Sequence, residues 1–145
     1  MKDLKNKIAV VQLLDPADFA HTNTKTNILD LAGFEGAVIA VSIGILTGVD
    51  ASNFLTIKMQ ESDTTADADF VDVPSDKLEG EFIIINSTDL DQTTQYVGYR
   101  GEKRYIRILL DYTGTGITAG IIAVVGILGL PGRSPAIGPS VITAS

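Results

Sequence analysis

The segment "GAVIAVSIGILTGV", residues Gly36–Val49, decides the fold. Large branched side chains stand at every second position from Ile39 to Ile45 and alternate with small ones. This period of two predicts a strand with one buried face. The segment is shorter than the roughly 20 apolar residues that a membrane-spanning helix needs. We therefore expect a half-buried strand whose outer side is smooth.

The same alternation recurs along most of the chain, and no long segment has the period of an amphipathic helix. The further segments that we expect as strands are Ile8–Leu14, Thr26–Asp30, Leu55–Gln60, Phe70–Val73, Glu81–Asn86, Gln95–Tyr99, Tyr105–Leu110 and Gly120–Leu128. Short strands separated by turn-rich clusters predict an all-β domain, an antiparallel β-sandwich or barrel. Helical turns are expected only at Pro16–Ala20 and Ser75–Leu78.

The chain has 145 residues, which is the usual size of one domain with a single core. We expect an N-terminal arm over residues 1–7, a β-sandwich over residues 8–130 and an extended tail over residues 131–145. Pro131, Pro135 and Pro139 stand among Gly and Ser in that tail. Because proline lacks an amide donor, we expect the tail to stay extended and not to pair in a sheet.

Charge and composition exclude several classes of partner. The chain carries 18 acidic and 11 basic residues, a formal net charge of −7, which disfavours binding to nucleic acid or to anionic membranes. Cysteine is absent, so disulfides, thiol nucleophiles and thiolate metal sites cannot form. The first residues lack the cleavage site of a signal peptide, and we expect an intracellular protein.

Residues suited to catalysis are scarce. His21 is the only histidine, and it lies in a polar loop with no evident partner for acid–base chemistry. We therefore expect no enzyme, no cofactor and no small-molecule substrate. The acidic segment 61–76 holds six carboxylates, the kind of ligand that calcium prefers, but it lacks the EF-hand pattern. We assign no metal site, and whether this segment binds calcium stays open.

Both faces of the expected strand Gly120–Leu128 are apolar. In a two-layer sandwich only one face of a sheet meets the core, so the other face needs a cover. That cover is either another part of the chain or another subunit. We expect Ile122, Val124 and Leu128 to lie on the side that associates with a second copy.

The segment "VGYRGEKRYIRILLDY", Val97–Tyr112, concentrates positive charge in an acidic chain. A turn at Arg100-Gly101-Glu102 predicts that the flanking strands form a hairpin. If the isoleucines of the second strand point inward, then Tyr105 and Arg107 point outward with Lys103. The resulting surface, here called the Tyr/Arg ribbon, comprises Tyr96, Tyr99, Arg100, Lys103, Arg104, Tyr105 and Arg107. It fits either a protein interface or cross-strand pairs that only stabilise the sheet.

The order of several segments resembles a family of small tailed-bacteriophage head proteins that are encoded near the major capsid protein. The similar segments are "DLKNKIAVVQLLDP", "DLAGFEGAVIAVSIG", "MQESDTTADADFVDV" and "YVGYRGEKRYIRI", followed by a turn and the apolar strand "AGIIAVVGILGLPGRSP". Together they cover nearly the whole chain. The tail Pro135–Ser145 has no counterpart in the family's pattern.

The resemblance implies a capsid decoration, or cement, protein with a jelly-roll-like β-sandwich. Such a protein is made in the host cytoplasm, binds the outer capsid surface of the virion and stabilises the shell by bridging capsomers. Its implied partner is the major capsid protein, and a homotrimer is the expected oligomer. We expect the capsid contacts to be the Tyr/Arg ribbon and the arm with Lys2, Lys5 and Lys7.

Two other functions stay open from the sequence. One is a carbohydrate-binding β-sandwich, which needs an exposed aromatic platform, whereas this chain has no Trp and only 6% aromatic residues. The other is a head–tail joining or minor tail protein, which would form a ring instead of a trimer.

Overall fold

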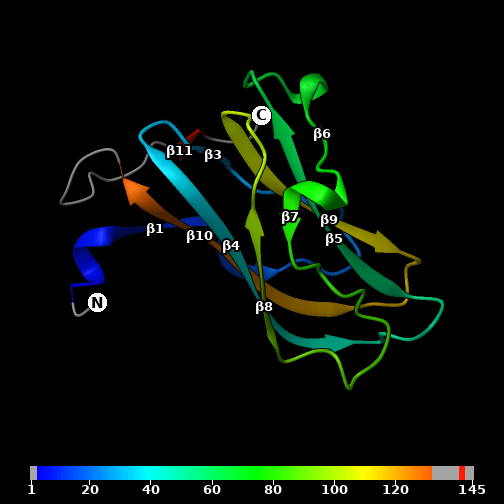
Figure 1. Ribbon diagram of the computed structural model, residues 1–145. Helices are drawn as coiled ribbons and strands as arrows, with labels where there is room; N and C mark the ends of the chain where they lie inside the picture. Colours follow the sequence, from blue (N-terminus) through cyan, green and yellow to red (C-terminus); the bar gives the residue numbers. More distant parts are fainter. Residues whose placement is uncertain (1–2, 132–140, 143–145) are drawn as a thin grey trace.

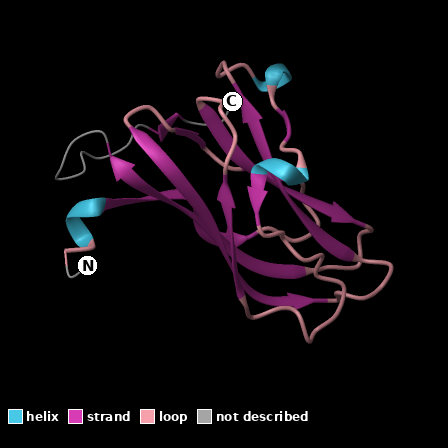
Figure 2. Cartoon of the chain, in the orientation of Figure 1, coloured by secondary structure: helices cyan, strands magenta, loops and turns pink. Residues whose placement is uncertain are grey.

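The computed structural model describes residues 3–131 and 141–142, which form two packed antiparallel sheets (Figure 1). The described strands are β1 Ile8–Asp18, β2 Thr24–Lys25, β3 Ile28–Asp30, β4 Phe34–Thr47, β5 Phe54–Ser62, β6 Val71–Asp72, β7 Leu78–Glu79, β8 Thr94–Tyr99, β9 Tyr105–Thr113, β10 Ala119–Pro131 and β11 Val141–Ile142. Three 3-10 helices join them, η1 Lys5–Lys7, η2 Asp67–Asp69 and η3 Ser75–Lys77 (Figure 2). The prediction of an all-β antiparallel sandwich is confirmed. No helix in the described part of the chain is long and apolar enough to cross a membrane.

The strand order is that of a jelly roll. Sheet A has the order β1-β10-β4-β8-β7, and sheet B has the order β11-β3-β9-β5-β6, with β2 also paired to β9. When β1, β3, β4, β5, β6, β8, β9 and β10 are numbered in chain order, sheet A reads 1-8-3-6 and sheet B reads 2-7-4-5. This is the order of two Greek keys wrapped into a jelly roll. Since one fold supports many functions, function has to be argued from the surfaces.

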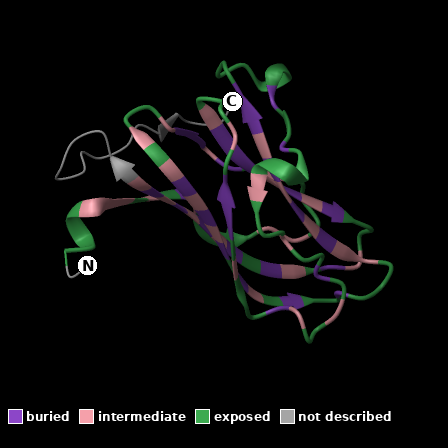
Figure 3. Cartoon of the chain, in the orientation of Figure 1, coloured by how far each residue is buried: buried purple, intermediate pink, exposed green. Residues whose placement is uncertain are grey.

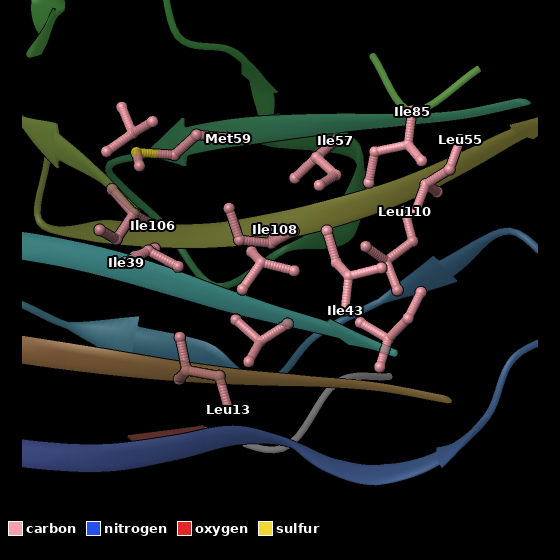
Figure 4. Packing of buried hydrophobic residues seen from close by; sticks show 14 of the residues in the cluster. Leu13, Ile39, Ile43, Leu55, Ile57, Met59, Ile85, Ile106, Ile108 and Leu110 are labelled. Atoms are coloured by element: carbon pink, nitrogen blue, oxygen red, sulfur yellow. The ribbon is translucent and has the colours of Figure 1, made fainter. Parts of the chain in front are cut away.

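The core lies between the two sheets. In Figure 4, Ile57 and Met59 of β5 and Ile108 of β9 lie across from Ile39 and Ile43 of β4. Buried and more exposed positions alternate along the strands, as Figure 3 shows. Each fully buried aliphatic side chain contributes about 1.5–3 kcal/mol relative to exposure, an upper estimate because the unfolded chain is itself partly compact.

The alternation in β4 breaks at a bulge near its end. The register between β4 and β10 shifts there, so that Gly44 and Ile45 both lie opposite Ile121. Ile45 is 60% exposed and Leu46 is buried in its place. The sequence-based assignment of Ile45 to the inner face is therefore wrong, because the extra residue of the bulge turns the side chain outward.

β10 buries the face that we had assigned to self-association. Ile122, Val124 and Leu128 are fully buried, whereas Ile121 on the opposite face is 60% exposed. The pairing with β4 explains this result, because Val124 lies beside the buried Val41 in the ladder. That assignment was wrong in its choice of face, since two equally apolar faces give no preference in the sequence. The expected doubly apolar strand is nevertheless present.

The expected hairpin in the segment 97–112 does not form. β8 pairs with β4 and β7 in sheet A, and β9 pairs with β5, β3 and β2 in sheet B. The connection between β8 and β9 passes around Tyr99, whose Oη accepts a hydrogen bond from the Lys103 amide at 3.0 Å. Tyr96 and Tyr105 therefore belong to different sheets, and the Tyr/Arg ribbon is not a continuous surface.

Two shorter segments also depart from the sequence-based expectation. β1 stays extended through Asp18, so no helical turn forms at Pro16–Ala20. Glu81–Asn86 is irregular apart from an isolated bridge at Ile85, because the Gln95 side chain holds the Ile83 amide at 2.8 Å in place of a backbone ladder. The helical turn expected near residue 75 is present as η3.

The two ends of the chain lie partly outside the described residues. The expected arm includes η1, and β1 begins at Ile8 as predicted. In the expected tail, Pro131 ends β10 opposite Phe34 and Val141–Ile142 pairs with β3, contrary to the expectation that the tail does not join a sheet. Val141 and Ile142 are apolar and are not proline, so both can take part in a ladder.

Candidate interaction surface

The outer face of sheet B is covered by charged and polar side chains that bind one another. Asp67, at the start of η2, accepts hydrogen bonds from Lys25 at 2.8 Å and from Arg107 at 2.7 Å. These bonds lower the pKa of the Asp67 carboxyl, the Lys25 bond more than the Arg107 bond. Lys58 and Asp111 form a further ion pair at 3.2 Å. This face is therefore a hydrated surface whose charges already have partners.

Arg107 is buried, although the sequence placed it on an exposed ribbon. Its side chain points to the outer side of sheet B, as predicted, but η2 and Phe70 cover it and leave the residue 4% exposed. The guanidinium lies 4.1 Å from the centre of the Phe70 ring and donates to Gln60 at 2.9 Å. Arg107 is thus unavailable to an external partner.

Several other residues of the expected ribbon are also engaged within the chain. Arg104 donates two hydrogen bonds to Asp30, at 2.9 and 3.0 Å, and these lower the pKa of the Asp30 carboxyl. Lys103 pairs with Asp63 at 2.7 Å. The partly exposed Arg100 lies 3.5 Å from Glu79. The basic residues of this segment therefore neutralise nearby acids instead of forming a basic patch.

The two tyrosines of β8 have opposite environments. Tyr99 is buried, and burial raises the pKa of its hydroxyl to about 12. Tyr96 is 73% exposed on the outer side of sheet A. Near Tyr99, Glu61 is buried with one carboxylate oxygen, Oε2, that has no hydrogen-bond partner. Of the two tyrosines, only Tyr96 can contact an external molecule.

The described residues do not assemble a metal site or an obvious catalytic site. In residues 3–131 and 141–142, no three Asp, Glu or His side chains converge on one point in a way that could hold a metal ion. Within the acidic segment, Asp69 accepts a hydrogen bond from Thr64 and Asp72 accepts one from Gln60. His21 lies in a tight turn with φ of 33° and its Nδ1 is 2.9 Å from the Ile117 carbonyl oxygen.

Sheet A carries a broad apolar surface on its outer side. The side chains that point away from the core there, here called the apolar face, are Val10 of β1, Val38, Ala40, Ser42 and Ile45 of β4, Thr94 and Tyr96 of β8, Ile121, Ala123, Val125 and Ile127 of β10, and Gln12 at the edge. Val10, Ile45 and Ile121 are each 60% exposed or slightly more. No described segment covers these three side chains.

Cross-strand pairing arranges the apolar face in rows that cross the sheet. One row is bulky and contains Val10, Ile127 and Val38. The middle row runs from Gln12 through Val125 and Ala40 to Tyr96. The third row is small and contains Ala123, Ser42 and Thr94. The small row is therefore a trough beside the bulky row, and beyond the trough Ile121 and Ile45 are bulky again.

The apolar face is also free of ionisable residues. No Asp, Glu, Lys or Arg occurs in Ile8–Leu14, Gly36–Thr47, Thr94–Tyr99 or Ala119–Pro131. Charges begin at its margins, where Glu79 of β7 pairs with Arg100 and where Asp15 and Asp18 follow in β1. A charge-depleted centre with a polar rim is typical of a protein interface. The four charge-free segments are visible in the sequence and could have identified this face.

The N-terminal arm comes directly before β1, which begins at Ile8. Lys5 is exposed, and Lys7 is partly exposed at the other end of η1. The exposed Leu4 precedes them. In Figure 1, η1 lies beyond the packed sheets, before β1. Lys2 lies outside the described residues. The arm is thus placed at one end of sheet A, next to the apolar face.

A hollow of about 690 Å³ opens near one end of the sandwich. Leu31 and Phe34 line it from one side, and Tyr99, Lys103 and Arg104 line it from the other. Because Lys103 and Arg104 are both held in ion pairs, the hollow offers no unpaired cation to a ligand. The apolar face is therefore the stronger candidate for a binding surface.

No protein-family model and no curated protein matches the chain. Similar solved structures include a Bacillus endospore appendage of a family of disulfide-linked pili, at 13% identity and a TM-score of 0.46 over 86% of this chain and 89% of that one. The C-terminal domain of EclA, a sugar-binding protein, has 9% identity and a TM-score of 0.42 over 88% and 81%.

A third similar structure is the Clostridium thermocellum xylanase 10B with its CBM22-1 and GH10 modules, complexed with xylohexaose. It has 10% identity and a TM-score of 0.44, and the match covers 92% of this chain but 30% of that one. Likenesses this distant do not indicate what this chain binds.

Proposed function

We propose that the protein is a non-enzymatic structural protein of a tailed-phage head, a capsid decoration protein that stabilises the shell from outside. The proposal joins the sequence resemblance to the distribution of side chains over the molecule. A protein that binds only to an assembled shell lowers the free energy of that shell by mass action, and several attachment points strengthen the effect. No chemical reaction is required.

The apolar face is the observation that carries this proposal. A contiguous apolar patch without charge is often functional, and protein interfaces are one common use of such a surface. The other sheet is charged, hydrated and internally paired, which suits a surface that faces water. Such a two-sided molecule fits a coat component that holds protein on one side and solvent on the other.

The N-terminal arm is the proposed capsid contact. Lys5 puts positive charge at the end of sheet A of an otherwise acidic protein, and the sequence has a further lysine, Lys2, outside the described residues. A short arm can reach a neighbouring subunit while the sandwich stays intact. The Tyr/Arg ribbon is no longer part of the proposed contact, because Arg107 and Tyr99 are buried.

The test is co-sedimentation with shells assembled from the major capsid protein of a tailed phage that encodes this chain. The full-length protein should pellet with the shells. A variant without residues 1–7 should pellet much less while its thermal melt is unchanged, since β1 begins only at Ile8. The matched control, Lys58→Glu on sheet B, should pellet as the native protein does. Failure of the native protein to pellet would refute the decoration function.

Carbohydrate binding is a second candidate, and Tyr96 is the observation that favours it. Its ring is 73% exposed and lies in the row next to the one that holds the hydroxyl groups of Thr94 and Ser42. A sugar could stack on that ring and bond to those hydroxyls. A glycan array would decide, with Tyr96→Ala as the control that should abolish any signal.

A head–tail joining or minor tail protein would form a ring of many copies, which size-exclusion chromatography would detect.

A further inference from the structure

We infer that the apolar face binds the same face of a second copy of this chain, so that two sandwiches pack through sheet A around a two-fold axis. This inference rests on the proposed function as a structural protein and names the partner of its main surface. It differs from the expected trimer in symmetry. Two independent properties of the face support it, namely charge and relief, and its size limits how stable the pair can be.

The absence of charge on the apolar face favours a partner surface that is also uncharged. Burying an ion against the apolar face would cost several kcal/mol unless a counter-charge met it there, and the face has none. A second copy meets this requirement, because its own apolar face is equally free of charge. The paired acids and bases of both copies then lie on the far sides, on sheet B and in the loops.

The relief of the face is complementary to itself. We place the two-fold axis in the plane between the two copies of sheet A, parallel to the middle row and perpendicular to the strands. Rotation about this axis reverses the direction of the strands in the second copy. The bulky row of one copy then faces the small row of the other, with Ile127 opposite Ala123 and Val38 opposite Ser42. The middle row faces itself, which brings the two copies of Val125 together. Aligned packing of two sheets about 10 Å apart is the usual geometry of β-sandwiches.

The size of the face predicts a pair of moderate affinity. Four strands about 4.8 Å apart and seven residues at about 3.3 Å each give a footprint of about 440 Å². A standard stable interface takes about 800 Å² from each partner. An interface of this size is typical of a transient contact, so we expect a pair that forms and dissociates with protein concentration.

Sedimentation of the full chain over about 1 to 300 µM tests the inference. The mass should rise from 15.4 kDa toward twice that value. Val125→Glu should weaken the association constant at least tenfold, because it puts a carboxylate in the middle row. The matched control is Leu109→Glu, at an outward position in the centre of sheet B between Lys25 and Lys58, and it should leave the association unchanged.

A mixing experiment identifies the symmetry. Val125→Glu and Val125→Lys should each stay monomeric alone and should form pairs when mixed, because the two-fold axis brings residue 125 of both copies together. Circular dichroism must show that each variant is folded. If it is not, Tyr96→Glu on the exposed edge of the same row replaces it.

Each alternative outcome overturns the inference. A monomer at all concentrations would do so, and so would a trimer that is insensitive to Val125→Glu, or mixed variants that fail to pair. The capsid assay is separate. Protein that pairs but does not pellet with shells would leave the inference standing and refute the decoration function, whereas a monomer that pellets would do the reverse.

Discussion

At the residue scale, Arg107 shows how a charged side chain can be buried on the outer side of a sheet. Its aliphatic stem and guanidinium lie under Phe70 and η2, and three partners hold the charge, Gln60, Asp67 and the ring. Because Arg can pair, donate and stack at once, it tolerates this position better than Lys. Its role is to fasten η2 to sheet B.

Replacing Arg107 by Met should test that role. Met keeps the apolar stem but loses the hydrogen bonds, so we expect the free energy of unfolding to fall by about 1.5 kcal/mol. Urea denaturation gives this value. The matched control is Lys58→Met, which breaks a partly exposed ion pair and should cost less than about 0.5 kcal/mol. Equal losses for the two variants would contradict the assigned role.

The ion pair between Asp30 and Arg104 should make the stability of the protein depend on pH. The hydrogen bonds from Arg104 are the largest cause that lowers the pKa of its carboxyl in the folded state. The stabilisation is therefore fully present above the unfolded pKa, near 3.8, and is lost as the pH falls through the folded pKa. We expect Asp30→Asn to melt below the native protein at pH 6, with the difference shrinking as the pH falls below 3.8. A difference that persists in acid would show that the charge of Asp30 is not the cause.

At the element scale, β10 is a strand with two apolar faces, one buried in the core and one on the outer side of sheet A. Ile122, Val124 and Leu128 fill the core, and Ile121, Ala123, Val125 and Ile127 belong to the apolar face. A strand flanked by β1 and β4 in the middle of a sheet has no free edge, so only its two faces can bind anything. This makes β10 the strand where core and interface can be compared directly.

Neighbouring alanine substitutions should separate the two faces. Ile122→Ala removes a fully buried side chain and should cost about 2–5 kcal/mol. Ile121→Ala removes an exposed one, and in dilute protein it should change the free energy of unfolding by less than about 0.5 kcal/mol. Urea denaturation at low micromolar concentration measures both. A larger loss for Ile121 would reverse the faces described for β10.

The sequence predicts the elements better than their pairing, and the reason is physical. Alternation in β4, β5 and β9 indicates strands with one buried face because a sandwich exposes the other. It cannot say which face of β10 is buried, since Ile121 and Ile122 are equally apolar. Nor does it reveal that the turn after Tyr99 crosses between sheets, because a crossing and a hairpin both need Gly101.

Candidate site residues were harder to predict than the fold. Arg107 was placed on the correct face of β9, but its cover comes from η2, about 40 residues earlier in the chain. The sequence alone does not reveal that contact. The apolar face could have been found, because the four segments that form it lack charge over their whole length. That signal is a property of four strands together, and no single strand shows it.

At the scale of the whole molecule, charge is separated from apolar surface. The net charge of −7 resides in sheet B, the loops and the margins, while the centre of sheet A is neutral. In a pair packed through sheet A, the two outer sheets are separated by three sheet spacings, about 30 Å. This exceeds the Debye length of about 10 Å at 0.1 M salt. Repulsion between the paired copies is therefore weak except in very dilute salt.

This geometry fixes how self-association should respond to salt. Between about 0.02 and 0.15 M NaCl the dissociation constant should fall, because screening removes the remaining repulsion between two acidic copies. Above that concentration it should stay level, since no ion pair crosses the apolar face. Capsid binding through the lysines of the arm should respond in the opposite way and weaken as salt rises. Sedimentation of the free protein and co-sedimentation with shells, both in the same salt series, give the two curves. If self-association weakened with salt in parallel with capsid binding, charged side chains would have to form the contact between copies, and the apolar face could not be the main surface.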